Sequence, residues 1–467
     1  MANKNELLRN LPSVDSLLET EAVKDILKDA PRKVVVQALR DAIDLNRSLI
    51  LKDSGCDNID KLPAAIIQAA LSCVGDDMKP YYRRIINATG IILHTALGRA
   101  VLAERALDQI QNHLRGYNLL QMDLATGKRS SRDGRLEALL QRLTGCEAAT
   151  VVNNNAAATA IALNSMAAGK EVIVSRGQLV EIGGAFRLPE VMEAAGVKMV
   201  EVGTTNKTHP RDYENAITED TAAIIRVHPS NYQITGFTSE VSLETLIDIA
   251  HRHNLVMIDD VGAGALFDFS RFGFQYEPPL PVSIQMGADL VTCSADKLIG
   301  GPQGGIILGK AEHIQKIRKS PWARILRVDK LTLALLEATL TLFLDEQLAL
   351  AESPTLRMLG RTLEDLTQQA NRIAKAVNET IAAGQLEIID GFSQMGSGSL
   401  PTQNLPTKLL AIKPAGMSLD ELTVKLRQYP TPIVARISEG QLLMDPRTML
   451  FDDEEIVVKA LVELLGN

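Results

Sequence analysis

The chain has 467 residues, of which 46% are hydrophobic and 23% charged, and its formal net charge is −8. This length and composition are typical of a globular protein with sizeable cores and about three domains. The acidic total excludes a uniformly basic surface for nucleic acid, although it leaves room for a local basic patch. The first residues lack the apolar core of a secretion signal, and no stretch approaches the ~18 apolar residues of a membrane span. We therefore expect a cytoplasmic protein with no membrane partner.

The cysteines are too dispersed to form a site together. They are Cys56, Cys73, Cys146 and Cys293, and none belongs to a CxxC pair. Neither a zinc site nor a disulfide framework is indicated, so we expect reduced thiols and no metal.

Three segments differ in their patterning. Residues 1–80 contain only helical patterns, at 13–29 after a Ser cap and at 31–51 and 61–73 after prolines, and predict a small helical domain. Residues 81–330 alternate short β-branched runs with helical stretches, which predicts a large α/β domain around a mostly parallel sheet. The apolar runs lie at 149–152, 171–175, 198–202, 222–227, 255–260, 289–294 and 304–308.

Residues 331–467 complete the chain. A long apolar-periodic helix at 331–344 leads into a predicted small α/β domain with a helix at 361–381 and strands near 386–390, 408–412, 432–437 and 441–445.

Lys297 follows the apolar run 289–294 and precedes a glycine-rich turn. This position predicts a lysine near the carboxyl edge of the sheet, where open α/β sheets bind ligands. Desolvation there lowers the pKa of a lysine and frees a neutral amine to form a Schiff base. A lysine before glycines more often lies in an ordinary surface turn. The Schiff-base interpretation therefore needs a second residue that supports it, a partner at the same edge of the sheet.

Asp260 supplies that partner, because it ends the run 255–260 and should lie at the same edge. A carboxylate in this place can keep a pyridinium nitrogen protonated, as pyridoxal-phosphate enzymes require. The alternative role of Asp260 is a helix cap or turn residue.

The segment Asn153–Ala158 predicts a phosphate cradle. It joins a strand to an alanine-rich helix, so the backbone at Asn154, Asn155 and Ala156 should present free N–H groups and the helix dipole to an anion. An asparagine cap without a ligand explains the same pattern. Ser294, three residues before the lysine, could donate a further hydrogen bond to the phosphate.

Two glycine patterns resemble nucleotide-binding motifs and are rejected. The segment 304–310 resembles a P-loop, but Ala311 lacks the hydroxyl that binds magnesium and the interior predicts a strand. Gly262-Ala263-Gly264 follows a strand, yet Phe267 occupies the place of the third glycine of a dinucleotide fingerprint.

With Lys297, Asp260 and the Asn153–Ala158 turn, the chain resembles fold-type I pyridoxal-phosphate enzymes. Further motifs are similar to those of the bacterial selenocysteine synthase family, the L-seryl-tRNA(Sec) selenium transferases. They lie at 86–100, 175–187, 202–206 and 394–399, and the opening 8–15 matches the family's N-terminal domain. The resemblance implies a fold-type I transferase with an N-terminal helical domain, which would bind tRNA, and a small C-terminal α/β domain.

The resemblance also implies a reaction. Seryl-tRNA(Sec) would lose water by β-elimination to give aminoacrylyl-tRNA, and selenium would be added from selenophosphate. Lys297 would hold pyridoxal 5'-phosphate and act as the base, and Asp296 would help hydroxide to leave; a turn-capping role for Asp296 is the alternative. Because selenophosphate is a polyanion, arginines should line its site, and the matching positions are Arg99, Arg324 and Arg327. For Arg324 and Arg327 the alternative is an exposed, solvated turn.

Other positions follow from the same resemblance. Thr204, Thr205 and Tyr232 match polar positions near the active site, and Gln178 is expected to lie over the cofactor ring. The family also implies a homo-oligomer, a decameric ring of dimers. Two other functions remain open: a pyridoxal-phosphate lyase of a small amino acid or amino-sugar acid, and a catalytically silent scaffold.

Overall fold

A computed structural model describes residues 4–52, 58–184, 186–229, 232–381 and 386–466, so Cys56 lies outside the described residues. The chain divides into two compact units, Met1–Arg84 and Ile85–Asn467. Within the described ranges, no helix combines the length and apolar character needed to cross a membrane.

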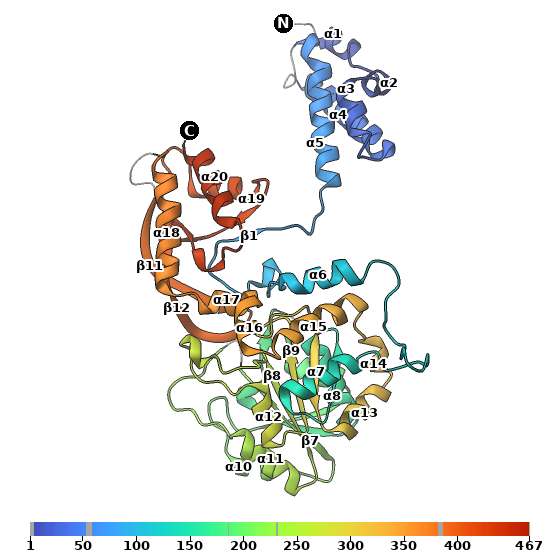
Figure 1. Ribbon diagram of the computed structural model, residues 1–467, viewed down its shortest axis with the longest axis vertical. Coiled ribbons are helices and arrows are strands. Elements are labelled where there is room, and N and C mark those ends of the chain that lie inside the picture. Colours follow the sequence, from blue (N-terminus) through green and yellow to red (C-terminus); the bar gives the residue numbers. More distant parts are fainter. Residues whose placement is uncertain (1–3, 53–57, 185, 230–231, 382–385, 467) are drawn as a thin grey trace. The chain divides into compact units, whose positions relative to one another are not determined.

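The first unit is helical (Figure 1). Ser13 caps α2 as expected, since its hydroxyl accepts a hydrogen bond from the backbone N–H of Ser16 at 3.1 Å. The prediction of one helix over 13–29 is wrong, because Thr20 has an extended backbone and its hydroxyl donates to the carbonyl of Leu17. The helices are α1 Lys4–Arg9, α2 Val14–Leu18, α3 Glu21–Ile26, α4 Arg32–Leu51 and α5 Leu62–Met78, with a 3-10 turn at Ile59–Lys61.

The second unit is built on a seven-stranded sheet of order β2-β10-β9-β8-β7-β3-β6. Strand β10 is antiparallel to both of its neighbours, and the remaining pairs are parallel. The prediction of a mostly parallel sheet is therefore confirmed. Its strands are β2 Ala148–Val152, β3 Glu171–Ser175, β6 Lys198–Val202, β7 Thr221–Val227, β8 Val256–Gly262, β9 Leu290–Ser294 and β10 Gly305–Gly309.

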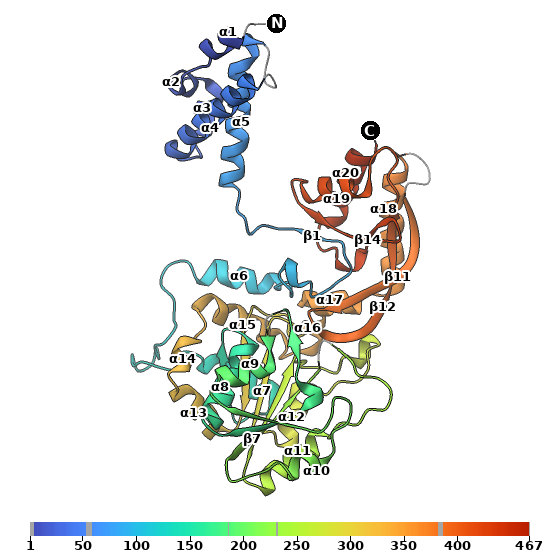
Figure 2. The ribbon, with the colours of Figure 1, turned by 180° about the vertical axis from the view of Figure 1, so that it is seen from behind.

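Helices cover both faces of this sheet (Figures 1 and 2), so its strands are apolar on both sides. Along β10, Ile306 and Leu308 enter one core while Ile307 enters the other. The first face is covered by α7 Gly134–Thr144, α11 Leu243–Arg252, α12 Leu280–Met286 and α15 Lys330–Leu342. The opposite face is covered by α8 Asn155–Ala167, α9 Leu188–Ala194 and α13 Ala311–Lys319.

A second, antiparallel sheet of order β11-β12-β15-β14 forms the C-terminal part of this unit. Its strands are β11 Leu386–Gly396, β12 Ser399–Ile412, β14 Arg436–Ser438 and β15 Gln441–Met444, packed with α18 Leu363–Asn378, α19 Leu419–Arg427 and α20 Asp453–Leu465. The short strand β1 Ile86–Asn87 pairs in parallel with β13 Ile433–Val434, which ties the start of the unit to this part. The remaining strands and α-helices are β4 Glu181–Ile182, β5 Phe186–Arg187, α6 Glu104–His113, α10 Pro210–Glu214, α14 Trp322–Ile325, α16 Glu346–Glu352 and α17 Pro354–Gly360.

Candidate active site

A cavity of about 340 Å³ opens at the carboxyl edge of the central sheet. This volume lies within the range of small-molecule and cofactor sites. Strands β8 and β9 lie side by side, so the residues at their ends meet at this edge. The predicted site residues that line the cavity are Arg99, Asn154, Asn155, Ala156, Asp260, Ser294 and Lys297.

Lys297 follows β9 in a tight turn and is 6% exposed. The turn is closed by hydrogen bonds from the N–H of Gly300 to the carbonyl of Lys297 and from the N–H of Gly301 to the carbonyl of Ala295. Gly300 has a φ of 78°, which glycine adopts without strain. Burial lowers the pKa of the Lys297 ammonium, as does the charge of Arg99, while Asp296 and Asp260 oppose the shift. The site therefore favours a neutral, nucleophilic amine.

Asp260 is buried on β8 and accepts three side-chain hydrogen bonds. Its donors are Nδ2 of Asn155 at 2.8 Å, Oγ1 of Thr292 at 3.0 Å and Oγ1 of Thr159 at 3.1 Å. Burial raises the pKa of the Asp260 carboxyl, and these donors work against that shift. The carboxylate is thereby held in one orientation in the wall of the cavity.

The beginning of α8 also lines the cavity, at Asn154, Asn155 and Ala156. Asn154 caps this helix by accepting a hydrogen bond from the N–H of Ala157 at 2.9 Å, which leaves the first helical N–H groups, those of Asn155 and Ala156, without partners within the helix. Gly305 permits the close approach of β10, because a Cβ there would lie 2.1 Å from the carbonyl oxygen of Asn154. Small side chains and free N–H groups at a helix start are suited to a phosphate.

Arg99 and Asp296 form an ion pair beside the lysine. Nη1 of Arg99 lies 2.6 Å from Oδ2 of Asp296, and the side chain of Asp296 is only 10% exposed. Arg99 lines the cavity of Lys297, while Asp296 faces an adjoining cavity that Arg99 also lines.

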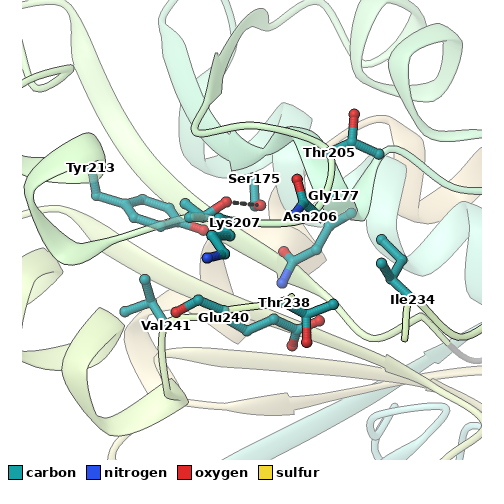
Figure 3. Close-up of a pocket in the computed structure, with 13 residues that line it drawn as sticks. Ser175, Gly177, Thr205, Asn206, Lys207, Tyr213, Ile234, Thr238, Glu240 and Val241 are labelled. Carbon is teal, nitrogen blue, oxygen red and sulfur yellow. Dashed lines mark hydrogen bonds between the residues drawn. The ribbon is translucent and has the colours of Figure 1, made fainter. Parts of the chain in front are cut away.

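Gln178 and Thr205 line a neighbouring, smaller cavity, which is drawn in Figure 3, and do not line that of Lys297. Gln178 is buried, and its Oε1 accepts a hydrogen bond from the N–H of Val227 at 3.1 Å. The hydroxyl of Tyr232 donates to the carbonyl of Gly177, and Oγ1 of Thr204 donates to the carbonyl of Lys207. These four predicted residues thus stand at the sheet edge but outside the lysine cavity.

Arg324 and Arg327 are exposed and lie outside the lysine cavity. The segment that carries them pairs with the end of β2. The N–H of Asn153 donates to the carbonyl of Leu326, and the backbone of Arg327 forms an isolated antiparallel β-bridge with Val152. Arg327 therefore lies close to the segment that leads from β2 into α8.

His228 was not predicted and lines the cavity with Lys297 and Asp260. Burial lowers its pKa to about 4, and the charge of Arg226 acts in the same direction, so the ring is neutral at physiological pH. It directly follows β7, and the strand-end rule that located Asp260 would also have located His228.

These residues fit pyridoxal phosphate. The cavity has a desolvated lysine, a buried carboxylate with a fixed orientation and a helix start with free N–H groups, which are the groups that an amine-linked, phosphorylated pyridine requires.

Known proteins resemble the chain over nearly its whole length. The L-seryl-tRNA(Sec) selenium transferase of Geobacter sulfurreducens is 44% identical over 459 residues, which cover 98% of this chain and 99% of the relative. That of Alkaliphilus metalliredigens is also 44% identical, over 98% of this chain and 99% of the relative, and that of Alkaliphilus oremlandii is 42% identical, over 99% and 100%.

One solved structure shows the fold. D-Glucosaminate-6-phosphate ammonia-lyase matches with a TM-score of 0.56 and 20% identity, covering 84% of this chain and 100% of that one. The α/β, fold-type I architecture expected from the sequence is thus confirmed. Residues 85–450 match the family described as L-seryl-tRNA selenium transferase, and residues 8–47 match the family described as selenocysteine synthase N terminal. The chain therefore belongs to the L-seryl-tRNA selenium transferase family.

Proposed function

We propose that this protein is an enzyme that converts L-seryl-tRNA(Sec) to L-selenocysteinyl-tRNA(Sec), with pyridoxal phosphate as cofactor and selenophosphate as selenium donor. The observation that carries the proposal is the desolvated Lys297 beside the Arg99–Asp296 pair, in one cavity with Asp260. Family membership over nearly the whole chain supports the tRNA substrate in place of a small amino acid or amino-sugar acid.

Lys297 would hold the cofactor through its amine, Asp260 would face the pyridine nitrogen, and the N–H groups of Asn155 and Ala156 would hold the phosphate. When bound, pyridoxal phosphate supplies an electron sink for the bond electrons released at the seryl α-carbon. Ser294, which ends β9 and lines the same cavity, adds a hydroxyl toward the phosphate.

The chain's own groups then handle protons and charge. Lys297 takes the proton from the α-carbon, since burial favours its neutral amine. Asp296, the next residue, supplies the proton with which the seryl hydroxyl leaves as water. Arg99, Arg324 and Arg327 hold the selenium donor, because planar guanidinium groups match phosphate oxygens in charge and geometry.

The proposal extends to the location, assembly and domains of the enzyme. We infer a cytoplasmic protein that assembles as a decameric ring of dimers. Thr204, Thr205, Tyr232 and Gln178 would act around the substrate from the edge of the sheet. The helices of residues 1–80 would hold the body of tRNA(Sec), and two regions of the later chain would form a large domain (81–330) and a small one (331–467).

A substrate comparison tests the function. The purified enzyme is incubated with selenophosphate and, in parallel, with seryl-tRNA(Sec), seryl-tRNA(Ser) or free L-serine. We expect selenium to become attached only to tRNA(Sec). Conversion of free serine at a comparable rate would replace the proposal by a lyase acting on small amino acids.

Asp260→Asn is expected to keep its cofactor and lose activity. An amide cannot keep the pyridine nitrogen protonated, so turnover should fall by about 10²-fold or more, the scale seen when an electrostatic stabiliser is removed. Asn155, Thr159 and Thr292 can still bond to the amide, which preserves the local packing. Visible absorbance measures occupancy, and single-turnover kinetics measure the rate. Near-normal turnover would leave Asp260 a structural role only.

Replacing Arg324 and Arg327 together by alanine should separate the two half-reactions. Both side chains are exposed, so the fold should tolerate the change. We expect water to be lost from the seryl group at nearly the normal rate, while selenium incorporation falls. Arg211→Ala on α10, where the arginine side chain is 78% exposed, is the matched control. Equal loss of both half-reactions would assign these arginines to tRNA positioning.

A further inference from the structure

The backbone at Arg99 is held in an unusual conformation. Arg99 has a φ of 63° and follows Gly98 at 93°, so two left-handed residues stand in a row. This conformation is costly for an arginine and persists only where the surroundings impose it. The turn is closed by a hydrogen bond from the N–H of Arg99 to the carbonyl of His94. The hydroxyl of Ser397 further fixes the segment by donating to the carbonyl of Leu93 at 2.6 Å.

This fixed turn places the guanidinium of Arg99 between two cavities. The inner cavity contains Lys297 and Asp260, and the outer cavity is lined by Asp296 and Gly301; Arg99 and Gln303 line both. The side chain of Arg99 is 34% exposed and that of Asp296 is 10% exposed. The carboxylate is thus covered largely by protein, while the arginine is reachable by a ligand.

The pair is short, with 2.6 Å between Nη1 and Oδ2, and no other hydrogen bond or ion pair of Arg99's side chain is found among the described residues. A guanidinium that forms two parallel hydrogen bonds with a phosphate group must direct its N–H donors toward that group. The long arginine side chain can rotate while its strained backbone stays fixed. One guanidinium therefore has two alternative anionic partners.

We propose that Arg99 changes its anionic partner during the reaction. Its guanidinium pairs with Asp296 in the resting site and leaves that carboxylate when a phosphate-bearing polyanion binds. This inference rests on the proposed function, in which the polyanion is the selenium donor. The arrival of the donor then unmasks the Asp296 carboxylate next to Lys297 in the same event. During the selenium step, the Asp296 carboxylate is then free of its arginine partner only while the donor is bound.

The charges around Lys297 link donor binding to the protonation of its amine. The titratable groups that act on the charge of Lys297 are Asp296, Arg99, Asp260 and the thiol of Cys293, and burial raises the pKa of that thiol, which keeps it neutral. Arg99 lowers the pKa of Lys297 and Asp296 raises it, so loss of the ion pair and binding of a dianion both increase proton affinity at this nitrogen. Donor binding should therefore be accompanied by a change in protonation at the lysine.

A double-mutant cycle tests the exchange, with inorganic phosphate as the probe and the cofactor-loaded full chain as the protein. Phosphate affinity is measured by calorimetry for wild type, Asp296→Asn, Arg99→Gln and the double variant. If Asp296 competes for Arg99, Asp296→Asn should tighten phosphate binding about tenfold when Arg99 is present. The same change should have less than about a threefold effect when Arg99 is glutamine, because contacting pairs are coupled and independent sites are not.

Equal tightening in both backgrounds would mean that Asp296 acts on phosphate only through its charge, and would overturn the exchange, as would unchanged or weaker binding by Asp296→Asn. Should Arg99→Gln lose the cofactor, Arg99→Lys repeats the cycle with the positive charge retained and two-point geometry lost. The measurement needs no tRNA, so a protein that shows the coupling but makes no selenocysteinyl-tRNA would refute the function and keep the exchange.

Discussion

Lys297→Ala is expected to lose both the visible absorbance of bound cofactor and all measurable turnover, a fall of about 10³-fold or more for a residue that serves as both attachment point and base. Lys297 is buried after β9, and burial lowers the pKa of its amine. Absorbance spectra and single-turnover assays measure the two effects.

The control for this prediction is Lys316→Ala, because Lys316 is exposed on α13. It should keep the spectrum and rate of the wild type. A Lys297→Ala protein with a visible band that borohydride fixes to the chain would place the attachment at another lysine and overturn the assignment.

Removal of residues 1–84 is expected to leave a coloured, folded protein that binds tRNA(Sec) at least about tenfold more weakly, equivalent to about 1.4 kcal/mol. The cut respects the structure, because Ile85–Asn467 is a compact unit and β1 at Ile86–Asn87 pairs with β13. The physical reason is reach: the acceptor end enters the cavity, while the far larger body of the tRNA needs a separate surface that reads shape and backbone.

Filter binding of full-length and truncated proteins measures this effect. Salt must be matched, since phosphate contacts weaken as salt increases. The visible absorbance of the truncated protein reports whether its cofactor site has formed. Equal tRNA affinity of the two coloured proteins would assign tRNA binding to residues after 84.

The central sheet was predictable because its strands are buried on both faces. Apolar, β-branched runs such as 171–175 and 222–227 became β3 and β7 almost residue for residue. Helix boundaries were harder: Thr20 interrupts the predicted helix 13–29, since its hydroxyl competes with the helix for a backbone carbonyl. Strand order and the antiparallel direction of β10 depend on long-range packing and left no local signal.

In the active site, residues at strand ends could be predicted from the sequence, and long-range contacts could not. Lys297 and Asp260 were located by one rule, that residues ending neighbouring parallel strands meet at the sheet edge. Contacts across long separations could not be read from spacing. The bond between Arg99 and Asp296 joins residues 197 positions apart, and the one between Asn155 and Asp260 spans 105. The burial of Gln178, which accepts a hydrogen bond from Val227 at the end of β7, likewise depends on tertiary packing.

The most direct test of the proposed reaction is the mass of the aminoacyl group on tRNA(Sec) after incubation of seryl-tRNA(Sec) with the enzyme and selenophosphate. Wild type and Lys297→Ala are compared. We predict that wild type replaces the hydroxyl by selenium, with the isotope pattern of that element, and that Lys297→Ala leaves the seryl group unchanged. An unaltered seryl group with the coloured wild-type protein would contradict the account.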